Sequence, residues 1–114
     1  MSIKTHYHGQ IAIIELSGRF DAHAAPLLKA WQDKANMPAQ VIVDLSGVTF
    51  IDSTALATLV SGMKRCRQHG GDLYLCGLQQ PVRIIFELTK LDRAFGIFPS
   101  ETEAITAFSI PVAL

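Results

Sequence analysis

The sequence predicts a single α/β domain over residues 1–114, built on a mixed, mostly parallel β-sheet with about four α-helices in the order ββαβαβαβα. Three observations support this fold class. The length of 114 residues suits one domain of ordinary size. Hydrophobic residues make up 49% of the chain, which is enough for a packed core. Short β-branched segments alternate with segments of helical periodicity, a pattern typical of a parallel sheet with helical crossovers.

The chain opens with two short predicted strands. Residues 3–8 and 11–16 are extended segments separated by a plausible turn around Gly9, and we expect them to pair in antiparallel fashion. The second segment is almost entirely apolar, which indicates a strand that is covered on both faces. Ser17-Gly18 is expected to end it.

A first helix is predicted over residues 22–35. Asp21 is a suitable N-cap, because its carboxylate can accept hydrogen bonds from the free amides of the first turn. Met37-Pro38 is expected to stop the helix, because proline cannot continue it. We expect the apolar face of this helix to comprise Leu27, Leu28, Trp31 and Ala35.

The centre of the chain contains the clearest strand and the longest helix. The apolar run over residues 41–45 predicts a central strand. Residues 46–52 are expected to form a loop that turns three apolar side chains into the core: Val48, Phe50 and Ile51.

A helix over residues 53–69 is expected to follow that loop and to end at Gly70-Gly71. Its inward face has apolar residues at helical spacing. These are Leu56, Leu59, Val60, Met63 and Cys66, whereas the outward face has Ala57, Ser61, Lys64 and Gln68.

The last third of the chain continues the alternation. Pro81 suits the first turn of a helix, and Ser100 suits a helix N-cap. We predict a strand over 73–76, a helix over 80–88, a weak strand over 96–98 and a helix over 101–108.

The composition disfavours several classes of function. The formal net charge is zero, so the chain lacks the basic surface expected for direct nucleic-acid binding or for an anionic membrane. No apolar run approaches the roughly 20 residues of a spanning helix, and the N-terminus does not resemble a secretory signal. We expect a cytoplasmic monomer or weak dimer without membrane insertion. Cys66 and Cys76 are expected to be core thiols.

The sequence also lacks the motifs of catalysis and cofactor binding. It has no glycine-rich phosphate loop, no dinucleotide-binding turn and no Gly-x-Ser-x-Gly nucleophile elbow. We therefore expect neither enzyme activity nor a cofactor. His6 and His8 could share one strand face and bind a metal weakly, but a solvated edge strand is the favoured interpretation, and no metal site is predicted.

The most unusual segment runs from Val48 to Leu56, where an apolar stretch leads into Asp52-Ser53-Thr54 at a predicted helix start. In a purely structural interpretation, Asp52 or Ser53 is an N-cap and Thr54 fills the first turn. In a functional interpretation, the serine presents its hydroxyl at the surface. The free amides nearby tolerate a phosphate, which adds about −1.5 to −2 charges. The residue types alone leave both interpretations open and favour the cap.

Four segments of the chain together carry a family resemblance. The most specific is the strand, loop and Asp-Ser-Thr over residues 41–54. The others are a strand with a Gly-x-x-Asp turn over 16–21, Gly70-Gly71-Asp72-Leu73 before a strand, and a long helix with its following turn over 82–92. In this order they resemble the STAS domains, specifically the bacterial anti-sigma factor antagonists, over nearly the whole chain.

The resemblance implies a mechanism. In such proteins the serine after the aspartate is phosphorylated by a partner kinase that is itself the anti-sigma factor. The unphosphorylated form binds that kinase and frees a sigma factor, and a serine phosphatase resets the switch. By position, Ser53 is the phosphoacceptor. The expected partner-binding residues are Asp21, His23, Asp52, Thr54, Ala55, Ala57 and Ser61.

The chain departs from the family pattern at Ala55 and Ala57, where glycine is common. Alanine favours the helix by about 1 kcal/mol per site, and we expect it to add methyl groups to the partner surface. Because STAS modules also serve other assemblies, the alternative function is an accessory subunit of a membrane lipid-transport complex or of a signalling assembly without a sigma factor.

Overall fold

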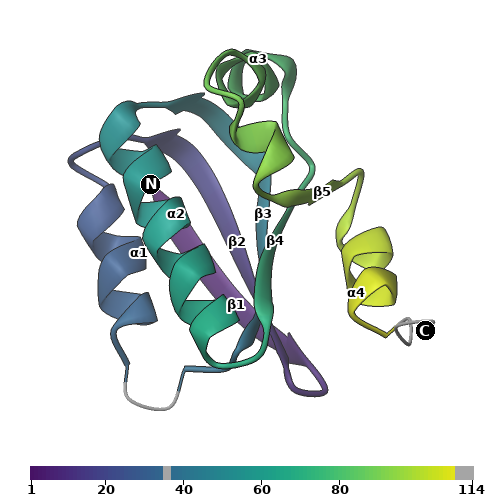
Figure 1. The fold of residues 1–114 in the computed structure, drawn as a ribbon. Helices are drawn as coiled ribbons and strands as arrows, with labels where there is room; N and C mark the ends of the chain where they lie inside the picture. Colours follow the sequence, from purple (N-terminus) through teal and green to yellow (C-terminus); the bar gives the residue numbers. More distant parts are fainter. Residues whose placement is uncertain (35–36, 110–114) are drawn as a thin grey trace.

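The computed structural model describes residues 1–34 and 37–109 and contains a five-stranded sheet with the order β1-β2-β3-β4-β5 (Figure 1). β1 pairs antiparallel with β2, and the other neighbouring strands are parallel. The predicted mixed, mostly parallel sheet is therefore confirmed. The strands are β1 (Ser2–His8), β2 (Ile11–Phe20), β3 (Gln40–Ile51), β4 (Asp72–Cys76) and β5 (Gly96–Phe98).

The helices cover the two faces of the sheet unequally. Figure 1 shows α1 and α2 side by side on one face and α4 on the other. The order of elements follows the prediction, with an additional 3-10 turn at Leu91–Arg93. The helices of the described residues are α1 (Ala25–Gln32), α2 (Ser53–Gln68), α3 (Gln80–Leu88) and α4 (Glu101–Ser109). None of them has the length and hydropathy that crossing a membrane requires.

The apolar strands supply two separate cores. Along β2, Ala12 and Ile14 belong to the larger core, which α1, α2 and α3 cover. Ile11 and Ile13 belong to a smaller core, which includes Ala104 of α4. This alternation follows from the two-residue period of a strand, and it confirms that β2 is covered on both faces.

The predicted loop over 46–52 is wrong, because β3 continues to Ile51 and pairs with β2 as far as Phe20. The expected end of β2 at Ser17-Gly18 is also wrong, because β2 continues to Phe20. Register shifts before Ser17 and after Gly18 accommodate these small residues within the strand. A Cβ at Gly47 would lie 2.7 Å from the Cβ of Ser17, so glycine permits the close approach. Val48 and Ile51 are buried as predicted, whereas the side chain of Phe50 is 38% exposed.

The first helix is shorter than predicted. It begins at Ala25, because Pro26 occupies the first turn, where its missing amide costs nothing. Asp21 therefore caps a preceding turn and not the helix itself. Leu28 is buried, but Leu27 is 52% exposed, contrary to the predicted apolar face. Ala35, the last residue of that face, lies outside the described residues.

The remaining elements agree with the prediction to within a residue at each end. The bounds of α3 and β5 coincide with those expected, and α2 ends one residue early, at Gln68. Gly70 adopts a φ of +84° after the end of α2, the left-handed conformation expected there. Both cysteines are buried free thiols.

Candidate functional site

The candidate site lies where β2 and β3 end side by side. Phe20 and Ile51 are partners in the parallel register, so the residues that follow them, Asp21 and Asp52, are neighbours in space. The carboxyl ends of parallel strands are the usual location of binding sites in open α/β sheets. The register thus brings together two aspartates that are distant in sequence.

Asp52 connects the two chain segments through its carboxylate. Its Oδ1 accepts from the amide of Ala55 at 3.0 Å and its Oδ2 accepts from the amide of Ala22 at 2.8 Å. Its own amide donates to the carbonyl of Phe20 at 3.3 Å. The Ala55 amide, followed by the Ala22 amide, lowers the pKa of Asp52. Asp52 is therefore an ionised N-cap of α2 that also fastens the turn after β2.

Asp21 organises that turn. Its Oδ1 accepts from the amides of His23 and Ala24 at 3.1 and 3.0 Å. His23 itself is exposed in this turn. Asp21 and His23, both predicted as partner-binding residues, therefore belong to one turn that Asp52 holds in place.

Arg19 and Phe50 extend the site beyond the residues named from the sequence. Arg19 Nε lies 3.7 Å from Asp21 Oδ2, and the Arg19 guanidinium lies 4.0 Å from the centre of the Phe50 ring. The two residues are register partners on β2 and β3. Sequence analysis missed them because it placed Phe50 in a buried loop; aligning the two strand ends would have paired them.

Ser53 is the first residue of α2 and is exposed. Because Asp52 is the cap, the Ser53 hydroxyl is not needed for that task, and it makes no hydrogen bond within residues 1–34 and 37–109. Both oxygens of the neighbouring Asp52 carboxylate are already occupied by amides, so this carboxylate is a poor general base for the serine. Ser53 thus offers an exposed hydroxyl that the neighbouring carboxylate does not activate as a nucleophile.

The outward face of α2 forms one wall of a shallow groove against α1, with a volume of about 230 Å³. Three predicted partner-binding residues, Thr54, Ala57 and Ser61, line it. Lys29 of α1 also lines the groove but is paired with Asp33 at 3.2 Å, and Arg65 of α2 adds a positive charge. The structure thus gathers these three residues into one surface that continues from Ser53.

Ala55 is the exception among the predicted partner residues. Its side chain is 0% exposed and belongs to the larger core, because the helical period turns it toward the sheet. The expectation that its methyl group adds to the partner surface is therefore wrong. Of the two alanines, Ala57 is the one exposed on that surface.

A family model described as the STAS domain matches residues 2–104. The chain belongs to the STAS domain family. An anti-sigma F factor antagonist of Paenibacillus polymyxa is 25% identical over 113 residues, which cover 96% of this chain and 97% of the relative. An anti-sigma-B factor antagonist of Listeria monocytogenes is 32% identical over 92 residues, which cover 79% of this chain and 81% of the relative.

The STAS fold is also evident from solved structures. The anti-sigma factor antagonist SpoIIAA in its unphosphorylated form gives a TM-score of 0.83 at 21% identity, covering 98% of this chain and 100% of that one. The Bacillus cell fate determinant SpoIIAA in its phosphorylated form gives a TM-score of 0.74 at 20% identity, covering 93% of this chain and 98% of that one. At these identities the likeness concerns the fold.

Proposed function

We propose that this STAS domain is an anti-sigma factor antagonist that is switched by phosphorylation of Ser53. The unphosphorylated domain binds an anti-sigma factor serine kinase and so releases a sigma factor. The kinase phosphorylates Ser53 and thereby ends the complex, and a serine phosphatase restores the binding form. The domain acts in the cytoplasm as a non-enzymatic regulator of transcription and does not contact nucleic acid.

The observation that carries this proposal is the state of Ser53. It is exposed at the first position of a 16-residue helix, and the capping role that would otherwise occupy it belongs to Asp52. A kinase can reach the hydroxyl without breaking a hydrogen bond of the described residues. The names of the two relatives, both anti-sigma factor antagonists, support the same role.

The position of Ser53 explains how a phosphate would act on binding and not on folding. A phosphate adds about −1.5 to −2 charges, and anions at a helix N-terminus are favoured by about 0.3–1 kcal/mol at exposed sites. The fold of α2 therefore tolerates the modification. A partner seated on the groove from Thr54 to Ser61 would instead meet a new anion beside the Asp52 carboxylate. Desolvating that charge in a complex is costly.

The test uses Ser53→Ala, Ser53→Asp and, as a matched control, Thr54→Ala at the neighbouring exposed hydroxyl. A candidate anti-sigma factor kinase from the same organism is incubated with each protein and ATP, and phosphate is located by mass spectrometry. We expect modification of the unaltered chain and of Thr54→Ala, but not of Ser53→Ala. Ser53→Ala should bind constitutively, and Ser53→Asp should bind at least about 10-fold more weakly.

The opposite pattern would overturn the proposal. In that pattern, the kinase binds the unaltered chain and Ser53→Asp equally and leaves Ser53 unmodified. Circular dichroism of each variant, with the expectation of an unchanged fold, separates loss of binding from loss of structure.

A further inference from the structure

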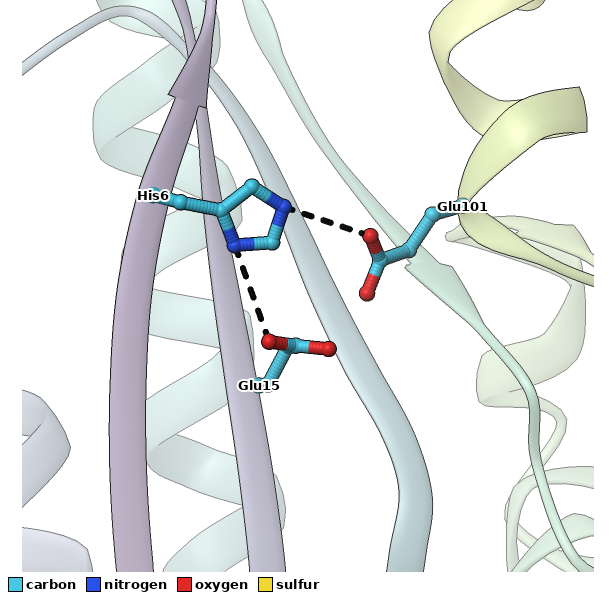
Figure 2. Close-up of side chains that lie close together, drawn as sticks. All are labelled: His6, Glu15 and Glu101. Atoms are coloured by element: carbon cyan, nitrogen blue, oxygen red, sulfur yellow. Dashed lines mark ion pairs between the residues drawn. The ribbon is translucent and has the colours of Figure 1, made fainter.

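A second group of titratable side chains lies on the face of the sheet that α4 covers. Figure 2 shows His6 of β1 between Glu15 of β2 and Glu101, the first residue of α4. The register explains the grouping on the sheet: Lys4 lies opposite Glu15, and His6 is two residues farther along the same face of β1. Three elements that are far apart in sequence therefore direct these side chains to one point.

The distances between these side chains suit a metal ion. His6 Nδ1 lies 3.6 Å from Glu15 Oε1, and His6 Nε2 lies 3.4 Å from Glu101 Oε1. One ligand atom from each of the three residues lies within 4.8 Å of the other two. Ligand atoms around a tetrahedral zinc ion are about 3.3 Å apart, given bonds of about 2.0–2.2 Å. Because an ion binds only one of the two imidazole nitrogens, the partly buried carboxylate beside the other nitrogen must turn toward the ion to complete the site.

The cluster around His6 also has more acidic side chains than basic ones. Asp44 of β3 is the register partner of Glu15, so a third carboxyl group lies in the same part of the sheet. The cationic groups facing this cluster are Lys4, opposite Glu15, and His6 when it is protonated. Close carboxylates repel one another, and a bound divalent cation removes that repulsion.

We propose that His6, Glu15 and Glu101 bind a divalent transition-metal ion of the zinc class, which fastens α4 to β1 and β2. One imidazole nitrogen and two carboxylates are ligands that suit zinc, whereas calcium and magnesium prefer oxygen ligands alone. Three protein ligands leave one position for water. The function of the ion is mechanical, because α4 otherwise rests on the small core that includes Ala104.

This site does not rest on the proposed function, since it lies on the sheet face away from α1 and α2. It also differs from the His6 and His8 pair considered from the sequence. Both histidines lie on the edge strand, but the cluster takes His6 alone and adds two glutamates. His8 therefore offers a matched control on the same strand.

The experiment is a calorimetric titration of the full, metal-free chain with Zn²⁺, repeated with His6→Ala, Glu101→Gln and the control His8→Ala. We expect one ion per chain with micromolar affinity, a loss of about 10-fold or more in His6→Ala and Glu101→Gln, and unchanged affinity in His8→Ala. Hydrogen exchange of the α4 amides should slow when Zn²⁺ is added to the unaltered chain but not to Glu101→Gln.

Two results would overturn the site. One is the absence of binding below millimolar concentration. The other is equal loss of affinity in His6→Ala and His8→Ala, which identifies scattered histidine binding at the edge strand. Thermal unfolding of the metal-free variants checks that each is folded; if His6→Ala is not, Glu15→Gln at the half-exposed Glu15 provides the same comparison.

Discussion

Replacement of Gly62 by alanine tests how tightly α1 and α2 are packed beneath the groove. Gly62 lies inside α2, where alanine is worth about 1 kcal/mol more than glycine on helix propensity alone. A Cβ at this position, however, would meet the side-chain amide of Gln32, with Cδ at 2.9 Å, and Leu73 Cδ1 at 3.1 Å. Gln32 is 4% exposed, and its Nε2 has no hydrogen-bond partner among the described residues. Helix propensity thus favours the alanine variant, whereas the close contacts of its Cβ destabilise it.

The magnitudes decide the outcome. Overpacking a well-packed site costs about 1–3 kcal/mol, so Gly62→Ala should change the free energy of unfolding by between about 0 and −2 kcal/mol. In a Gln32→Ala background the amide is gone, and the same substitution should stabilise by up to about 1 kcal/mol. The coupling between the two positions is then about 1–3 kcal/mol.

The assay is a double-mutant cycle with urea and thermal denaturation of the unaltered chain, both single variants and the double variant. For 114 residues, 1 kcal/mol corresponds to about 4 °C in Tm, so thermal denaturation can measure a coupling energy of this size. A coupling below about 0.5 kcal/mol would refute the reasoning, because it would mean that Gln32 does not oppose the added methyl group.

Three further outcomes are expected. Hydrogen bonds from backbone amides lower the pKa of Asp52 in the folded state. The stabilisation by the ionised Asp52 is therefore fully present above its ordinary pKa of 3.8 and is lost as the pH falls through the lowered pKa. Urea denaturation between pH 2 and 7 should therefore show a shallower acid decline for Asp52→Asn than for the unaltered chain. Burial raises the pKa of Cys66 to about 11 and of Cys76 to about 12, so a thiol reagent at pH 8 should label neither in the folded protein and both in urea. Gly71→Ala would place a Cβ against the backbone of Ala39, 2.9 Å from the Ala39 Cβ, and should destabilise by about 1–3 kcal/mol in the same denaturation assay.

Hydrophobic pattern was sufficient to predict the order of the elements but not the ends of β2 and β3. Ser17-Gly18 and Ser46-Gly47 each have the composition of a turn. In the structure Ser17 lies opposite Gly47 on the adjacent strand, directly after a register shift, and the small side chains allow the strands to approach. That pairing is a property of two segments together, so neither segment alone reveals it.

The candidate site was predictable to a similar extent. Asp52 and Ser53 could be placed at a helix start from local residue types, but those types left open which residue is the cap. In the structure the amide of Ala55 donates to Asp52, which makes Asp52 the cap, and the second contact of Asp52 comes from the amide of Ala22, 30 residues away. The exposed pair of Arg19 and Phe50 likewise depends on strand register and not on a motif.

The double use of Asp52 has a consequence for how such a domain can diversify. Its two contacts are made with backbone amides, so the join between the turn after β2 and the start of α2 does not depend on the side chain of the exposed Ala22. His23 can therefore be exchanged for another residue without loosening the support beneath Ser53. Under the proposed function, partner choice and the chemistry of switching would then be separable traits that can change independently among related domains.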